Sequence, residues 1–132
     1  MTMLSDLKSL ITTLAPTETT IAEIREPPHD PTDPHTAPAA VLTLYSTGGP
    51  QASSDFSGGT FAPRTAQLRV RDPLARQCEA RTEALYALFV AVRAYPQFPR
   101  IVASSAPFYG YPPDAASGAT IGSFNLSLVW SG

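Results

Sequence analysis

Residues 63–95 combine an alternating strand pattern with the only long helical pattern in the chain, and this pair limits the folds available to it. Residues 66–71 alternate apolar and polar side chains, which is typical of a half-buried antiparallel strand. Asp72 and Pro73 then suit the N-cap and the first position of a helix. The apolar residues of this helix follow at helical spacing: Leu74, Cys78, Leu85, Leu88, Phe89 and Val92. A helix of this length spans about 34 Å, so it can cover one face of a small sheet.

The remaining patterns add a second helix and further strands. Residues 3–14 carry apolar side chains at helical spacing and predict a short amphipathic helix that packs on the sheet. Besides residues 64–71, strands are expected at residues 19–25, 40–46, 100–104 and 119–131. The sequence therefore predicts an α+β fold of order α-β-β-β-α-β-β. It should form a single domain over residues 1–132, with an antiparallel sheet and two helices packed on one face.

Three segments are predicted to be irregular loops, at about residues 26–39, 47–63 and 106–118. Residues 26–38 include five prolines, which exclude regular structure and favour a stiff, extended connector. The other two loops are rich in Gly, Ser, Pro and aromatic residues. Long loops of this kind often carry function.

Composition narrows the classes of function. The net charge of -2 disfavours a general nucleic-acid binder, since such proteins need a basic footprint. Cys78 is the only cysteine, so no internal disulfide can form, and its place on the helical stripe predicts a buried thiol in a reducing cytoplasm. No apolar run approaches the roughly 20 residues of a membrane span, and the charges in residues 1–14 do not suit a signal peptide.

One cluster of residues could carry catalytic chemistry. His29, Asp30, Asp33 and His35 cluster in the Pro-rich segment and include side chains that bind zinc. A solvated loop, however, does not supply the fixed geometry that metal ligands need. The Gly-Gly pairs at 48–49 and 58–59 lack the Lys-Ser/Thr ending of a phosphate-binding loop. We therefore expect no catalytic residue, no bound metal and no cofactor.

The expected interface combines cations of one strand with aromatic residues of two loops. Arg69 and Arg71 share the outward face of the strand at 64–71, and Arg64 lies at its start. With no adjacent acid they would repel each other unless a partner or the helix supplied carboxylates. An ordinary solvated strand face is the alternative. Aromatic side chains on loops favour protein contacts, and here they are Phe56, Phe61, Tyr109 and Tyr111.

Several short motifs resemble the tail terminator, or tail completion, proteins of long-tailed bacteriophages, a family that includes a small group often labelled minor capsid proteins. A strand ends in Leu-Tyr-x-Thr-Gly-Gly-Pro at residues 44–50, and Pro-Arg-x-x-x-Leu-Arg-Val-Arg-Asp-Pro follows at 63–73. Glu-Ala-Leu-Tyr-Ala-Leu lies at 83–88 and Phe-Asn-Leu-Ser-Leu at 124–128. The resemblance extends from about residue 3 to residue 131. The Pro-rich residues 26–38 and the loop at 106–118 depart from the family's pattern.

The resemblance implies a structural protein of the virion neck, assembled in the host cytoplasm, rather than an enzyme. Such a protein forms a homo-oligomeric ring of six copies on the head-proximal end of the tail tube. The ring ends polymerisation of the tube protein and docks the head-completion protein, with the loop at 47–63 directed toward the tube or lumen. The alternatives are a head–tail joining protein, a bacterial binding module, and a small metal-dependent hydrolase that uses His29, Asp30, Asp33 and His35.

Overall fold

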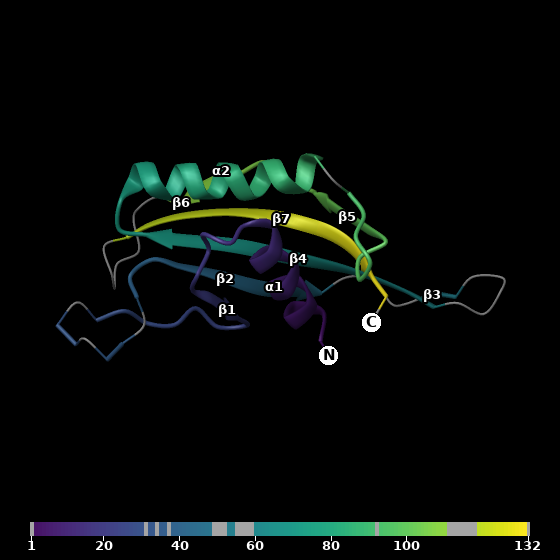
Figure 1. The fold of residues 1–132 in the computed structure, drawn as a ribbon, viewed down its shortest axis with the longest axis horizontal. Coiled ribbons are helices and arrows are strands. Elements are labelled where there is room, and N and C mark those ends of the chain that lie inside the picture. Colours follow the sequence, from purple (N-terminus) through teal and green to yellow (C-terminus); the bar gives the residue numbers. More distant parts are fainter. Residues whose placement is uncertain are drawn as a thin grey trace.

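The computed structural model describes residues 2–30, 32–33, 35–36, 38–48, 53–54, 60–91, 93–110 and 119–131 (Figure 1). Its elements, in chain order, are α1 (Met3–Leu14), β1 (Ile21–Glu23), β2 (Val41–Gly48), β3 (Ser53–Ser54), β4 (Thr60–Asp72), α2 (Ala75–Ala91), β5 (Arg100–Ala103), β6 (Phe108–Gly110) and β7 (Thr120–Trp130). The predicted α+β class is confirmed, and so is the order of the helices and main strands.

The sheet has the order β1-β2-β4-β7-β5, with β3 paired to β4 and β6 paired to β7. Strands β2, β4, β7 and β5 are antiparallel neighbours, so this part of the sheet is antiparallel as predicted. Strand β1 differs, because it runs parallel to β2. A parallel pair needs a long crossover, and residues 24–40 supply it here.

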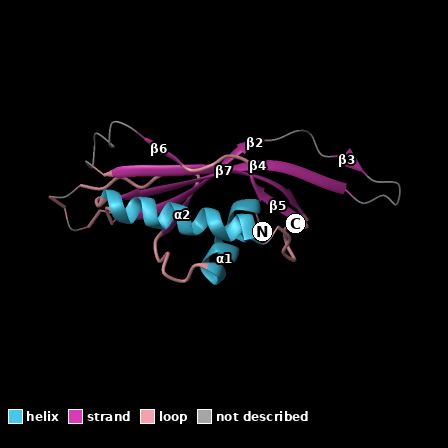
Figure 2. Ribbon diagram, turned by 90° about the horizontal axis from the view of Figure 1, so that it is seen from above, coloured by secondary structure: helices cyan, strands magenta, loops and turns pink. Residues whose placement is uncertain are grey.

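Both helices cover the same face of the sheet (Figure 2). Apolar side chains of α1, of α2 and of the sheet form one buried cluster there: Met3, Leu4, Leu7, Ile11, Leu42, Leu44, Ala66, Leu68, Val70, Cys78, Leu85, Phe89, Phe98, Ile101, Phe124, Leu126 and Leu128. Each sheet residue in this cluster alternates with a neighbour that points to the other side, which we call the outer face. The alternation seen in the sequence therefore sets which face the helices cover.

Helix α1 begins with a capping box and is tied to the last strand. The Thr2 hydroxyl accepts a hydrogen bond from the Ser5 amide at 3.1 Å, and the Ser5 hydroxyl accepts one from the Thr2 amide at 3.0 Å. These bonds satisfy amides that a helix start leaves free. Asp6 of α1 is buried, and its Oδ2 accepts a hydrogen bond at 2.8 Å from Nε1 of Trp130, the last residue of β7.

The junction between β4 and α2 lies where it was predicted, but the helix begins at Ala75 and not at Pro73, and one apolar residue was wrongly expected to be buried. Asp72 Oδ1 accepts a hydrogen bond from the Leu74 amide at 2.9 Å, and Cys78, Leu85 and Phe89 are buried. Leu74 was expected on the buried stripe but is 59% exposed, because it lies in the turn before Ala75, where the helix begins. Val92 lies outside the described residues.

Two of the expected irregular loops contain strand residues. In the 47–63 segment, β3 pairs with the start of β4. In the 106–118 segment, β6 pairs with residues 121–123 of β7. Strand β5 covers only residues 126–129 of that edge, so the remaining backbone groups of β7 are open to β6. Propensity alone did not predict β6, because its pairing depends on an edge built by distant residues.

Candidate interaction surface

The fold separates the three arginines of β4. Arg69 and Arg71 lie on the outer face, because they alternate along β4 with Leu68 and Val70, which point to the helices. Arg64 pairs in register with Leu128, a core residue, so it lies on the helix side near the end of the sheet. Its Nη1 donates to the Pro63 carbonyl at 3.0 Å.

Arg71 is buried under the Pro-rich segment, with 2% of its surface exposed. Its Nε donates to the Ala39 carbonyl at 2.9 Å, its Nη1 to the Pro27 carbonyl at 2.7 Å, and its Nη2 to the Pro38 carbonyl at 3.1 Å. The planar guanidinium has five donors in a fixed arrangement and no acceptor. A single side chain therefore joins the two ends of the Pro-rich segment, and we call this arrangement the Arg71 clasp.

The carboxylate that these arginines need belongs to the same chain. Glu26 Oε1 lies 3.1 Å from Arg69 Nε, and Glu26 Oε2 lies 3.6 Å from Arg71 Nη1. From the sequence, that acid was expected in a partner or on the helix. The Arg69 side chain is 36% exposed, whereas the Arg71 side chain is only 2% exposed and is not accessible in this conformation. Burial, and then the charge of Glu26, raise the pKa of the nearby Tyr45 hydroxyl.

Of the four predicted interface aromatics, the structure places the side chain of Tyr109 alone. Phe56 and Tyr111 lie outside the described residues, and Phe61 belongs to β4 but its side chain is outside them. The Tyr109 hydroxyl donates to Glu83 Oε1 of α2 at 2.8 Å. Burial and this hydrogen bond raise the pKa of Tyr109 well above its usual value. Tyr109 thus fastens β6 to α2 instead of pointing away from the body.

An aromatic that was not proposed for the interface is the more accessible one. Phe108 is 69% exposed. It pairs in register with Ser123, which pairs with Arg69, which pairs with Thr43. These four side chains form one row across the outer face. The next rows are polar, with Gln67 beside Asn125 and Thr65 beside Ser127.

A buried ion network, which the sequence analysis missed, connects the segment after α1 to α2. Arg81 Nε donates to Glu18 Oε2 at 3.0 Å, with a second bond from Nη2 to Glu18 Oε1, and Nη1 donates to Asp72 Oδ2 at 3.1 Å. Burial alone would lower the pKa of Arg81, but hydrogen bonds and charge from Glu18 and Asp72 outweigh it and raise that pKa. Glu18 and Arg81 are 63 residues apart, so no local pattern relates them.

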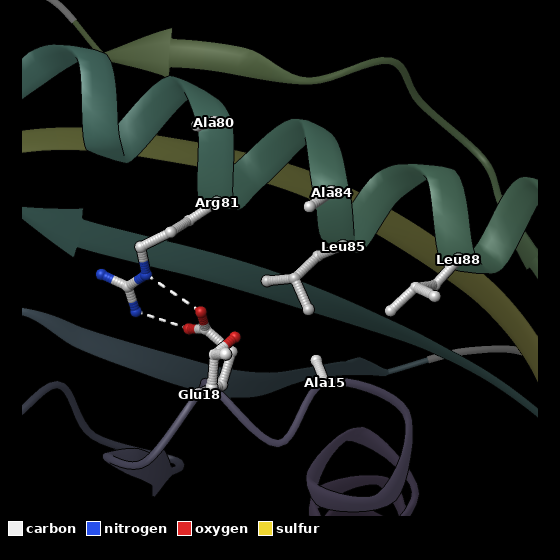
Figure 3. A pocket seen from close by; sticks show the side chains of 8 residues that line it. Ala15, Glu18, Ala80, Arg81, Ala84, Leu85 and Leu88 are labelled. Carbon is white, nitrogen blue, oxygen red and sulfur yellow. Dashed lines mark hydrogen bonds and ion pairs between the residues drawn. The ribbon is translucent and has the colours of Figure 1, made fainter.

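Beside this network lies a shallow groove between the chain after α1 and helix α2 (Figure 3). Its volume is about 200 Å³. The Glu18–Arg81 pair lies at one end, and the rest of the wall consists of Thr17 and five apolar side chains: Ala15, Ala80, Ala84, Leu85 and Leu88. Both carboxylates and the guanidinium are already paired with each other, so the groove offers a ligand chiefly apolar contacts.

The two carboxylates proposed for a metal site accept hydrogen bonds within turns. Asp30 Oδ1 accepts from the Thr32 amide at 2.9 Å and from its hydroxyl at 2.7 Å, and Asp33 Oδ1 accepts from the His35 amide at 2.9 Å. These bonds to Thr32 lower the pKa of Asp30. Within the described ranges, no three His, Cys, Asp or Glu side chains are grouped so that they could hold a metal ion. The described residues thus give the hydrolase alternative no metal-binding group.

No protein-family model matches this chain, and no curated protein sequence matches it either. Neither α1 nor α2, the helices of the described ranges, has the length and hydropathy of a membrane-spanning segment.

Proposed function

We propose that this chain is a tail terminator. In this proposal, copies of the chain form a ring on the head-proximal end of a phage tail tube, end its polymerisation, and present a new surface to the neck. A tube grows because each ring exposes a surface complementary to the next ring, a contact that does not close. A terminator matches the last ring on one side only. The mechanism is geometric and needs no catalytic residue.

The observation that carries the proposal is the hairpin formed by β3 and the start of β4. Pairing with β7 begins at Ala62 and pairing with β2 begins at Thr65, so Thr60 and Phe61 pair only with β3. The hairpin therefore extends beyond the rest of the sheet, at the far right in Figure 1. The motif resemblance assigns the same segment to the tube or the lumen, and a projecting arm suits that contact.

The two edges of the sheet suit a ring of identical copies. Among the described strands, β1 forms one edge, and β5 with β6 forms the other. Backbone groups at an open edge favour pairing with another chain. The two edges are different surfaces, so contact between them is heterologous and closes into a ring when the rotation per copy allows it.

Mass and shape test the proposal first. We expect light scattering to give a mass of about six chains, the copy number that the resemblance implies, and negative-stain images to show rings with a central hole. The protein should also shorten tubes when it is added to polymerising tube subunits. A monomer that neither caps tubes nor changes their length would overturn the proposal. Rings that bind the head but not the tube would favour the head–tail joining alternative.

A single substitution at the β5 edge tests how the ring forms. The amide of Ile101 points away from β7, to the Arg93 carbonyl, whereas the Ser104 amide donates to Asn125 of β7. By alternation the Ala103 amide also points away from β7. Ala103→Pro should therefore leave the sheet intact and prevent a neighbour from pairing there, so rings are lost. Ala103→Val is the matched control, because it adds bulk and keeps the amide. Equal ring formation by both variants would contradict an edge contact at β5.

A further inference from the structure

The chain between β1 and β2 is fastened to the outer face at a few defined points. We call its described residues, from Arg25 to Ala40, the strap. The Arg71 clasp binds the carbonyls of Pro27, Pro38 and Ala39, and Glu26 adds its carboxylate. All of these bonds are made by the Arg71 guanidinium, and Arg69 Nε makes one further bond to Glu26 at 3.1 Å. Loss of the Arg71 guanidinium would therefore release Pro38 and Ala39 and leave the other end of the strap held by the Glu26–Arg69 pair.

Outer-face residues in register with Arg71 and Arg69 are buried as well. Val41 and Thr43 are 0% exposed and Ile121 is 7% exposed, yet Val41 and Ile121 are not members of the helix-side core, and Thr43 alternates with the core residues Leu42 and Leu44. Val41 and Ile121 pair in register with Arg71, and Thr43 pairs with Arg69. Thr43 Oγ1 is also buried without a hydrogen-bond partner among the described residues. A buried hydroxyl without a partner disfavours the closed arrangement.

The backbone is strained where the strap leaves β1. Ile24 has a φ of 73°, a left-handed conformation that is an outlier for a β-branched residue. The Arg25 amide donates to the Glu23 carbonyl at 2.8 Å across it, so Ile24 is the centre of a γ-turn of the rare, strained kind. Its side chain is 74% exposed, so burial of that side chain does not offset the strain.

We propose that the strap is a cover that opens about Ile24 while the rest of the fold stays intact. When the strap is closed, the Arg71 clasp holds it and the γ-turn is strained. Opening relieves the turn, frees the Thr43 hydroxyl and uncovers the outer face from Arg71 to Ile121. That surface adjoins the row of Arg69 and Phe108. The strap thus controls access to one end of the outer face, whatever partner the protein has.

A buried reporter thiol tests this directly. In the full chain, the substitution Thr43→Cys puts a second thiol under the strap at little change in volume. We expect a thiol reagent, with the labelled site identified by mass spectrometry, to label this thiol at least about tenfold faster than Cys78 of the same chain, because local openings need less free energy than unfolding of the core. Cys78 is 0% exposed in the helix-side core, so its labelling reports unfolding of the core. Equal rates for the two thiols would overturn the proposal.

The hinge is tested by a residue that tolerates its conformation. Ile24→Asn, added to the reporter chain, should slow labelling about tenfold, because Asn adopts the left-handed region readily and the closed state loses its strain. Arg25→Asn is the matched control at the next exposed position and should leave the rate unchanged. Arg71→Lys should speed labelling, because an ammonium cannot reproduce the guanidinium's three bonds. If Ile24→Asn labels as fast as the reporter chain, the strained turn does not drive opening and the proposal fails.

Discussion

Helix α2 approaches the sheet closely at Gly122 of β7. A Cβ atom built on Gly122 would lie 2.4 Å from Thr82 Oγ1 and 3.2 Å from Thr82 Cβ. Thr82 is 0% exposed, and its hydroxyl donates to the Cys78 carbonyl at 2.7 Å, so it has little room to rotate away. Gly122→Ala should therefore force α2 away from the sheet.

The expected loss of stability is the difference of two effects. Overpacking in a core costs about 1–3 kcal/mol. Replacing Gly by Ala in a strand returns about 0.5–1 kcal/mol, because the unfolded chain loses conformational freedom. Gly122→Ala should then lower the free energy of unfolding by about 1 kcal/mol, within a range of about 0–2.5 kcal/mol. In the Thr82→Ala background the closest atom is absent, and most of that loss should disappear.

A double-mutant cycle measures this coupling. Urea unfolding of the parent, the two single variants and the double variant should give a favourable coupling of about 1–2 kcal/mol at constant m value. Gly110→Ala is the matched control: its Cβ would lie 3.6 Å from Ile121 Cβ, an ordinary contact, so we expect no loss. Effects of Gly122→Ala and Thr82→Ala that add within about 0.5 kcal/mol would refute the steric argument.

Two further predictions concern buried polar groups. The raised pKa of Tyr109, caused by burial and by Glu83, means that the folded chain keeps a proton that the unfolded chain loses above about pH 10. Stability should thus fall as pH rises above 10, less steeply in Tyr109→Phe; identical slopes in urea unfolding would contradict this. Arg81→Met leaves Glu18 and Asp72 buried without their cation, so unfolding should become easier by about 3–5 kcal/mol. A loss below about 1 kcal/mol, as for a surface pair, would show that the network is solvated.

The elements that sequence patterns predicted are those whose own residues decide the outcome. Residues 3–14 form α1 as expected, because the capping box and the apolar stripe are both local. Strand β7 follows its alternation of apolar and polar residues. The direction of β1 and the existence of β6 depend instead on the path of the chain and on an edge left open by β5. A window of a few residues contains neither piece of information.

The candidate interface was harder to predict, because a charged residue on the outer side of a strand was read as exposed. Arg71 is instead buried by residues about 32 to 44 positions away. The signal in the sequence was the Pro-rich segment, whose extended character was expected but whose position on the sheet was not. A charge on an outer face is thus a poor guide to accessibility until the long connections are placed.

The chemistry of proline and arginine relates the burial of Arg71 to the position of the Pro-rich segment. A proline has a carbonyl acceptor and no amide donor, so a Pro-rich segment has more acceptors than donors. An arginine side chain has five donors and no acceptor. Such a segment can lie on a sheet with its carbonyls satisfied only where donors are supplied from outside, and Arg71 supplies three of them to Pro27, Pro38 and Ala39. The burial of Arg71 and the placement of the strap are therefore one arrangement, and neither would be stable without the other.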